Sequence, residues 1–238
     1  MMKHSFFSVI FLSFAFTYVL LVDLFSLEEK KLPNDLRWVR HSMEYKSLCE
    51  QIYCQASKKI SLINEISKEH SAVVVDLDET VLDNSEYQVE RLKLGLNFSQ
   101  DSWSNWVNRK RSTLVPGAKK FLKRVRELGI KVVFLSNRMH ANLKPTKENL
   151  RTLGVLSEKD LFLLRRDNSD TKEIRRAEIL SGMGRISEIG PTKVVAYLGD
   201  QMGDFPAHHP KDLGTSVFIF PNPMSVSYTH LTLPTSYP

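Results

Sequence analysis

The sequence predicts an α/β fold, in which a parallel sheet has helices on both faces and a helical insertion after its first strand. Short apolar runs alternate with amphipathic segments through the central part of the chain, as in parallel strands joined by helices. One segment that carries two tryptophans interrupts this alternation directly after the first run. With 238 residues, of which 42% are hydrophobic and 25% charged, the chain can form one sizeable core.

Five apolar runs are the candidate strands. Runs such as VVVDL and KVVFLS hold consecutive apolar residues, which suits strands that are covered on both faces. The strands are expected over residues 72–77, 131–135, 160–164, 193–198 and 216–220.

Helical patterns precede and separate these strands. Residues 33–67 repeat apolar side chains at intervals of three and four, as an amphipathic helix does. Residues 116–128 begin with proline and stop at Gly129, and residues 143–153 stop at Gly154, which are common signals for the two ends of a helix. Residues 171–180 are expected to form a third helix between strands.

Residues 83–115 contain no predicted strand, and we interpret them as a helical insertion, or cap, that covers the ends of the strands. Trp103 and Trp106 lie three residues apart, which is ordinary spacing for core packing on one helix face. Stacking on a nucleotide base is the alternative for each of them. Tyr87 is an equal candidate for lining a pocket, because it lies nearer the acidic end of the first strand.

The two ends of the chain differ from its central part. Lys3 and His4 precede an almost uncharged apolar run, so residues 1–26 are expected to be a cleaved export signal or an uncleaved membrane anchor. Either alternative places the body of the protein outside the cytoplasm. Residues 226–235 read VSYTHLTLPT and resemble the translation of a sequencing adapter. We therefore expect residues 226–238 to be an artefact and assign the folded domain to residues 27–225.

Charge and cysteine content limit the classes of partner. The formal net charge is +6, but basic residues are dispersed and form no tract interleaved with aromatic residues, so no nucleic-acid partner is expected. A basic surface suits the attraction of small anionic substrates. Cys49 and Cys54, the only cysteines, would point about 140° apart on a helix, so a disulfide between them is not expected.

Polar side chains gather where three of the predicted strands end, and ligands in open α/β sheets bind at these carboxyl ends. A lysine lies between the third and fourth strands, near the start of a helix. Carboxylates, a hydroxyl and an ammonium that converge there would hold a hard divalent cation and a phosphoryl group. The residues are Asp76, Asp78 and Thr80 in DLDET, Ser136, Asn137 and Arg138 in LSNR, Asp200 and Asp204 in LGDQMGDF, and Lys172.

Each of these groups has a chemical task in phosphoryl transfer. Asp76, at the tip of its strand, would be the nucleophile, since carboxylates form phosphoenzyme intermediates. Asp78 would give a proton to the leaving oxygen and later take one from water. Ser136 and Lys172 would hold and neutralise the oxygens of the transferred group.

The expected cation is Mg²⁺, which takes oxygen ligands and few protein carboxylates. Asp76, Asp200 and the main-chain oxygen of Asp78 would bind it, and Asp204 would hold this arrangement in place from outside the ligand set.

At these residues the sequence resembles the haloacid dehalogenase superfamily of phosphotransferases. More closely, DLDETVLDNSEY, VPGAKKFL, LSNR, KEIRR and LGDQMGDF look like segments of the bacterial class B-like acid phosphatases, whose nearest members are the outer-membrane acid phosphatases and 5′-nucleotidases of the lipoprotein e type. The likeness runs from about residue 36 to residue 224. Four motifs in order on suitable elements are a specific signal, whereas one D-x-D-x-T is a modest one.

This resemblance implies a Rossmann-like core, dependence on Mg²⁺, and hydrolysis of phosphomonoesters such as nucleoside 5′-monophosphates through an aspartyl-phosphate. It also implies the periplasm, the outer membrane or the cell surface as the location. The lipid-carrying cysteine of the family is missing here, so membrane association would depend on the N-terminal segment. Asp78 separates the chain from the dehalogenase branch, and Asp76 separates it from plant storage relatives that have lost the nucleophile.

Other interpretations remain open at this point. The chain could be a non-catalytic binding or storage protein on the same fold, or a cytoplasmic protein phosphatase of the DLDET type. Asp204 could cap the following segment, Ser136 could only form a turn, and Lys172 has four arginines as rivals. Arg138 either holds substrate phosphate or braces its loop, and Asn137 shapes that loop. Thr80, Asn137, Arg138, Tyr87, Trp103 and Trp106 are the candidate substrate-binding residues, and oligomeric state is not predicted.

Overall fold

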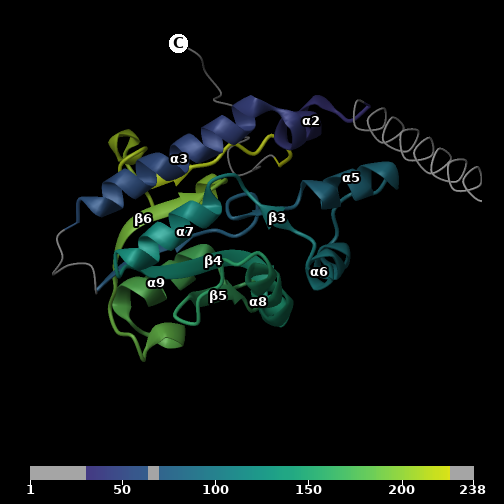
Figure 1. Cartoon of the computed structure of the whole chain (residues 1–238). Coiled ribbons are helices and arrows are strands. Elements are labelled where there is room, and N and C mark those ends of the chain that lie inside the picture. The colour runs from purple at the N-terminus through teal and green to yellow at the C-terminus, as the bar shows by residue number, and fades with distance from the viewer. Residues whose placement is uncertain (1–30, 64–69, 226–238) are drawn as a thin grey trace, which may run out of the picture.

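The computed structural model describes residues 31–63 and 70–225, and its centre is a five-stranded parallel sheet (Figure 1). The strand order is β5-β4-β1-β6-β7, so that the first strand lies in the middle of the sheet. Every neighbouring pair in this sheet is parallel, which confirms the predicted fold class. The strands are β1 (Ser71–Val75), β4 (Lys131–Met139), β5 (Leu161–Arg165), β6 (Lys193–Gly199) and β7 (Val217–Ile219).

Helices pack on both faces of the sheet, and the side chains of β1 alternate between the two. Val73 and Val75 belong to a core with α3 (Met43–Ser61) and α7 (Ala118–Glu127). Ala72 and Val74 belong to a second core with Ile179 of α9 (Lys172–Ser181). All five residues of β1 are buried, as expected for a central strand with apolar side chains on both faces.

The N-terminal helical region consists of two helices. The first, α2, spans Asn34–His41, and α3 starts at Met43. Ser42 between them has an extended backbone, and its hydroxyl accepts a hydrogen bond from the main-chain N–H of Tyr45 at 3.0 Å. A serine that caps the second helix in this way ends the first one.

The insertion leaves the sheet directly after the β1 loop and contains α5 (Ser85–Lys93) and α6 (Gln100–Arg109). The prediction that residues 83–115 contain no strand was wrong at both ends of this segment. β2 (Leu82–Asp83) and β3 (Thr113–Leu114) form an antiparallel pair that closes its base. Two-residue strands are too short to show an alternating pattern, so no pattern in the sequence indicates them.

The remaining elements follow the expected order with small changes in length. They are α8 (Leu143–Thr152) and the short 3₁₀ helices η1 (His140–Asn142), η2 (Gly184–Ile186), η3 (Met202–Asp204) and η4 (Pro210–Asp212). In the described part of the chain, no helix is both long enough and apolar enough to cross a membrane. The predictions for residues 1–26 and 226–238 lie outside the described residues.

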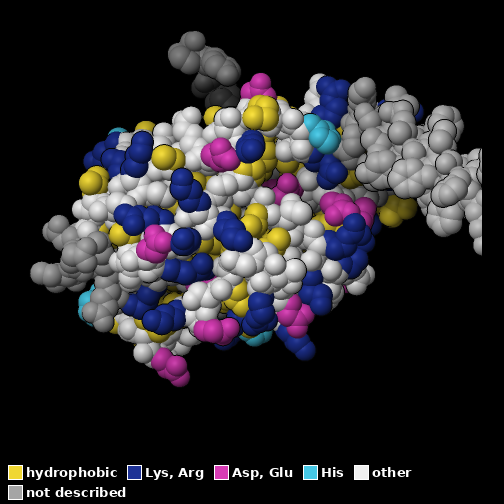
Figure 2. Space-filling view, viewed as in Figure 1, with side chains coloured by type: hydrophobic (Ala, Val, Ile, Leu, Met, Phe, Trp, Pro, Cys, Tyr) yellow, Lys and Arg dark blue, Asp and Glu magenta, His cyan; other side chains and the backbone are white. Residues whose placement is uncertain are grey.

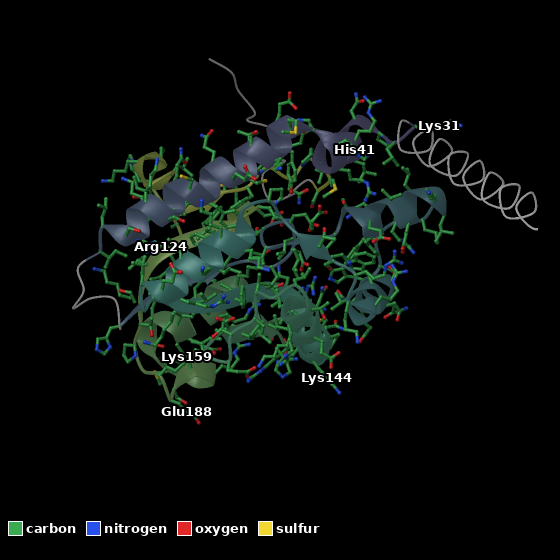
Figure 3. All side chains as sticks on the ribbon, in the orientation of Figure 1. Lys31, His41, Arg124, Lys144, Lys159 and Glu188 are labelled. Atoms are coloured by element: carbon green, nitrogen blue, oxygen red, sulfur yellow. The ribbon has the colours of Figure 1, made fainter. Side chains whose placement is uncertain are left out.

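Charged side chains are dispersed over the surface. Figure 2 shows Lys and Arg side chains intermixed with Asp and Glu on the visible face. In Figure 3, the labelled Lys144 and Glu188 lie at the edge of the molecule. Both cysteines are free thiols, as expected from their spacing: Cys49 is buried and Cys54 is exposed.

Candidate active site

Asp76 lies at the carboxyl end of the central strand, where the backbone fixes it firmly. Its main-chain N–H donates to the carbonyl oxygen of Leu198 in β6 at 2.9 Å, which continues the pairing between the two strands by one residue. The residue is 6% exposed. The nucleophile predicted from DLDET is therefore held on rigid parallel strands and not on a free loop.

Three carboxylates and one ammonium meet at this end of the sheet. Oxygens of Asp76, Asp200 and Asp204 all lie within 4.8 Å of one another. The ammonium of Lys172, at the first position of α9, lies 2.6 Å from Asp76 Oδ1 and also pairs with Asp204 Oδ1. Segments separated by up to 128 positions along the chain are thus brought to one place, as predicted from the motifs.

The charges of this cluster fit a divalent cation. Burial raises the pKa of the Asp76 carboxyl well above its usual value, and the neighbouring Asp204 and Asp200 raise it further, against the effect of Lys172. Burial and then Asp204 raise the pKa of Asp200 to about 7. Burial alone would lower the pKa of Lys172, but Asp76 and Asp204 raise it. Three carboxylates beside one ammonium leave two negative charges, and hard oxygen donors suit Mg²⁺ or a similar ion.

Two residues set the position of the acids that follow β6. Gly199 is needed there because a Cβ at this position would overlap the Asp204 carboxylate. Asn222 donates to Asp200 Oδ2 at 2.8 Å, a role that was not predicted from the sequence. Its one signal is its place after the fifth strand, since the carboxyl ends of parallel strands share an edge of the sheet.

Asp78 has different partners from Asp76. Arg138 in β4 donates to Asp78 Oδ1 from Nε at 2.9 Å and from Nη2 at 2.7 Å, and its side chain is fully buried. Arg138 Nη1 also donates to Thr146 at 3.1 Å. The Ser136 hydroxyl lies 3.4 Å from Asp78 Oδ2. Of the two roles considered for Arg138, these contacts correspond to bracing, with Asp78 as the group that is braced.

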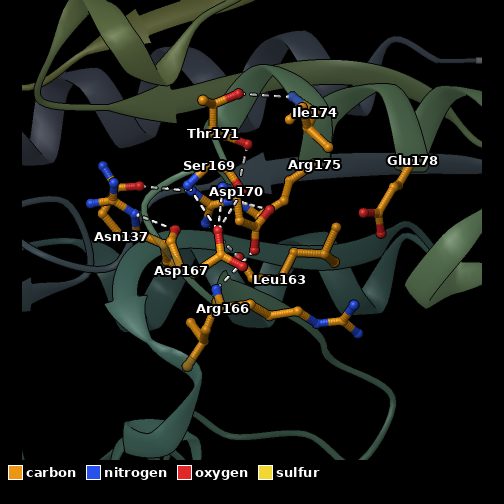
Figure 4. A network of polar contacts seen from close by, with 12 residues as sticks. Asn137, Leu163, Arg166, Asp167, Ser169, Asp170, Thr171, Ile174, Arg175 and Glu178 are labelled. Atoms are coloured by element: carbon orange, nitrogen blue, oxygen red, sulfur yellow. Dashed lines mark hydrogen bonds and ion pairs between the residues drawn. The ribbon is translucent and has the colours of Figure 1, made fainter.

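Arg175 of α9 contacts the loop of the serine motif, and Figure 4 shows it near Asn137 and Leu163. Its guanidinium donates to the carbonyl oxygens of Ser136 at 2.6 Å and Leu163 at 3.0 Å, and to Asn137 Oδ1 at 2.7 Å. Asn137 therefore shapes the loop, as predicted. Arg175 was considered only as a rival to Lys172, but it is Lys172 that contacts Asp76.

The other arginine rivals also contact protein groups away from the nucleophile. Arg165 donates to the carbonyl oxygens of Asp167 and Asn168, and Arg176 donates to that of Gly203. Arg166 is exposed, although its main-chain N–H donates to Asp170. Of the cations in and near KEIRR that were considered, Lys172 is thus the one that contacts Asp76.

The loop between Asp78 and the insertion has an unusual backbone. Glu79 has a φ of 56°, in the left-handed region that non-glycine residues rarely adopt. The hydroxyl of Thr80 is buried and has no hydrogen-bond partner among the described residues. The main-chain oxygen of Thr80 accepts a hydrogen bond from the Tyr53 hydroxyl, which ties the loop to α3.

The candidate aromatic residues divide into two groups. Tyr87 and Trp106 are 2% and 1% exposed and form the core of the insertion. Trp103 is half-buried and packs edge-on against Tyr87 at 5.0 Å between ring centroids. The Arg138 guanidinium carbon lies 5.9 Å from the Trp103 ring, which places Trp103 beside the group that braces Asp78.

One family model matches a segment that contains all of these motifs. Residues 26–228 match the model described as HAD superfamily, subfamily IIIB (acid phosphatase).

The chain belongs to this family.

Solved structures agree with the assignment. The class C acid phosphatase from Bacillus anthracis is 29% identical in sequence and superposes with a TM-score of 0.69 over 80% of this chain and 83% of that one. The same enzyme with tungstate bound matches equally well. These comparisons confirm the family that the four motifs predict and its α/β fold. They also confirm the class of reaction, which is the hydrolysis of phosphoric monoesters.

Curated relatives include plant proteins with other names. The stem 31 kDa glycoprotein of Glycine max is 29% identical over 185 residues, which cover 75% of this chain and 66% of the relative. Vegetative storage protein 1 of Arabidopsis thaliana is 26% identical over 154 residues, which cover 63% of this chain and 53% of the relative. The chain therefore spans between about half and two thirds of the length of these relatives.

Proposed function

We propose that this chain is a Mg²⁺-dependent acid phosphatase that hydrolyses phosphomonoesters, nucleoside 5′-monophosphates among them, through an aspartyl-phosphate on Asp76. One observation carries the proposal. The buried Asp76 carboxylate contacts the Lys172 ammonium at 2.6 Å and shares its site with Asp200 and Asp204, while Asp78 is held separately by Arg138. A nucleophile and an acid–base group with distinct environments are what a two-step phosphatase needs.

In the first step, a carboxylate oxygen of Asp76 attacks phosphorus and the bond from phosphorus to the ester oxygen breaks. Asp78 donates its proton to that leaving oxygen, so that an alcohol departs. In the second step, Asp78 takes a proton from a water molecule that attacks phosphorus. The bond between phosphorus and Asp76 then breaks, and inorganic phosphate leaves.

The surrounding groups stabilise charge during both steps. Lys172 and Ser136 face the region where the oxygens of the phosphoryl group would lie, and they offset its negative charge. A divalent cation held by Asp76, Asp200 and the main-chain oxygen of Asp78, with Asp204 close by, would supply further positive charge there. The tungstate complex of the Bacillus anthracis enzyme supports an oxyanion site in the family.

The second candidate function is storage without catalysis, which the name of the Arabidopsis thaliana relative favours. The convergence of Asp76, Lys172 and Asp200 in one cluster, with Asp78 held beside it by Arg138, supports catalysis instead.

The test is phosphate release by the full chain from a panel of phosphomonoesters, including nucleoside 5′-monophosphates and phosphotyrosine, over a range of Mg²⁺ concentrations. We expect turnover of nucleoside monophosphates that requires Mg²⁺ and that falls by about 10³-fold or more in Asp76→Asn, which removes the nucleophile. No phosphate release by the native chain from any of these esters would instead support storage, and equal turnover by the native chain and Asp76→Asn would remove Asp76 as the nucleophile.

We also propose that residues 1–26 export the protein to the periplasm, the outer membrane or the cell surface. The proposal is supported by the basic start and the apolar run of that segment. Fractionation of cells that express the full chain tests it, and recovery in the cytoplasm with an intact N-terminus would contradict it.

A further inference from the structure

One fully buried side chain, Asn84, connects the insertion to Asp78. Its amide nitrogen donates to Asp78 Oδ1 at 3.0 Å, to Glu79 Oε1 at 3.1 Å and to the carbonyl oxygen of Leu82 at 3.2 Å. Asn84 is 0% exposed, so these contacts are shielded from water. Both carboxylates of the catalytic loop are therefore held by one amide group.

The amide oxygen of Asn84 faces the insertion. It accepts from Trp106 Nε1 at 2.9 Å, from the Ser112 hydroxyl at 2.6 Å and from Arg138 Nη2 at 3.4 Å. Trp106 lies on α6 and Ser112 lies just before β3. Turning the amide over would set its NH₂ group against the N–H groups of Trp106 and Arg138, so the network fixes one orientation.

Asp78 is consequently held from two sides. Arg138 of β4 donates to it, and so does Asn84 on the side of the insertion. Arg138 also donates to Asn84. A displacement of α6 would reach Asn84 through the Trp106 hydrogen bond and then Asp78 through the amide nitrogen. The position of the acid–base group thus depends on the position of the insertion.

We infer that Asn84 is a positioning residue for proton transfer by Asp78, and that the insertion acts on this step through it. The inference rests on the proposed function. Proton donation to a leaving group contributes about 10²–10⁴-fold to rate, and it requires the acid to lie within hydrogen-bond reach of the leaving oxygen. Loss of the Asn84 contact would displace Asp78 without removing the nucleophile, Lys172 or the metal-binding acids.

The test compares two substrates with different needs for a proton. A nucleoside 5′-monophosphate loses an alkoxide, which must be protonated as it leaves, whereas p-nitrophenyl phosphate loses a stable phenolate. In Asn84→Asp, which keeps the shape but replaces the donor by an acceptor, kcat/KM for the nucleotide should fall about tenfold or more beyond the fall for p-nitrophenyl phosphate. A merely structural role would lower both values by the same factor.

Asn142→Asp is the matched control. Asn142 is also buried and also joins the sheet side to the insertion, because it accepts from Ser104 of α6 at 3.1 Å. Among the described residues it makes no hydrogen bond to Asp78. We expect any loss in this variant to be equal for the two substrates, and a loss selective for the nucleotide would overturn the inference, as would equal losses in Asn84→Asp.

A second variant covers the case in which Asn84→Asp fails to fold. Trp106→Phe keeps an aromatic ring in the core of the insertion but removes the donor to Asn84. It should lower kcat/KM in the same selective way by about two- to fivefold, and equal effects on both substrates would overturn the inference. If the native chain hydrolysed neither substrate, the proposed function itself would fail, which is a different outcome from equal losses.

Discussion

At the scale of residues, the chemistry depends on giving neighbouring acids different partners. Asp76 contacts an ammonium, Asp78 contacts a guanidinium, and Asp200 accepts from the amide of Asn222. Two carboxylates that lie two positions apart in DLDET are therefore separated in their electrostatic surroundings. Under the proposed function, such separation would assign one acid to nucleophilic attack and the other to proton transfer.

Lys172 should be the cation on which phosphoryl transfer depends. In Lys172→Met, kcat/KM for phosphomonoesters should fall about 10²–10³-fold, because a preorganised positive charge is lost from a buried site. Arg176→Met is the control, since Arg176 donates to the Gly203 carbonyl and not to Asp76. Steady-state kinetics of both variants with saturating Mg²⁺ make the comparison, and an equal loss in Arg176→Met would refute the assignment.

The sequence predicts the residues that carry out the reaction better than those that support them. Asp76, Asp78 and Asp200 stand in motifs at strand ends and Lys172 starts the helix after β5, so their convergence follows from the topology of a parallel sheet. Asn84 stands outside those spacings, and its role depends on partners that are 22, 28 and 54 positions away. No local pattern reveals contacts of that kind.

At the scale of elements, α9 carries both a catalytic group and the anchor of a neighbouring loop. Lys172 at its start reaches the acids, and Arg175 one turn later reaches the carbonyl oxygen of Ser136. The helix therefore sets the distance between the cation and the hydroxyl that face the phosphoryl group. Because Arg175 is fully buried, this link is fixed within the fold.

Arg175 should be required for stability to a degree unusual for an arginine. Arg175→Met should lower the free energy of unfolding by about 3–5 kcal/mol, because two buried carbonyl oxygens and the side-chain oxygen of Asn137 lose their donor. Urea denaturation measures the change. The exposed Arg166 provides the control, since Arg166→Met should change stability by less than about 0.5 kcal/mol. A similar small change in Arg175→Met would contradict this account of α9.

The five strands of the main sheet were predictable because each is an apolar run, and their observed bounds differ from the expected ones by at most four residues at either end. β4 runs on to Met139, beyond its apolar part, and its pairing with β5 shifts register after Ser136. β2 and β3 were missed because they are defined by pairing with each other and not by their own composition. Short strands of this kind depend on the tertiary structure.

At the scale of the whole molecule, a chain with a formal charge of +6 concentrates negative charge at one edge of its sheet. The net positive charge of the chain favours the approach of anionic phosphomonoesters. The acid cluster itself carries excess negative charge when no cation is bound, and this opposes folding. Metal binding and stability should therefore be coupled.

This coupling should depend on pH. The pKa of Asp200 is raised from 3.8 to about 7 in the folded chain, so the folded state binds a proton more readily than the unfolded state. The proton that Asp200 binds in the folded state stabilises the fold fully below about pH 4, and this stabilisation is lost as the pH rises through 7. Mg²⁺ should therefore raise the Tm by several degrees more at pH 8 than at pH 5, where protons compete with it.

Thermal unfolding with EDTA or excess Mg²⁺ at the two pH values measures this effect. Asp200→Asn serves as the control and should lose most of the difference between the two pH values. An equal shift in Tm at pH 5 and pH 8 in the native chain would contradict the proposed role of the acid cluster.

The central claim is that Asp76 becomes covalently phosphorylated, and it can be measured directly. The full chain is mixed with Mg²⁺ and a nucleoside 5′-monophosphate, quenched in acid during turnover, digested and analysed by mass spectrometry. The account predicts one phosphoryl group on the peptide that contains Asp76, located on that residue and absent from Asp76→Asn. Turnover with the phosphoryl group on another residue, or with no phosphorylated peptide at any quench time, would contradict it.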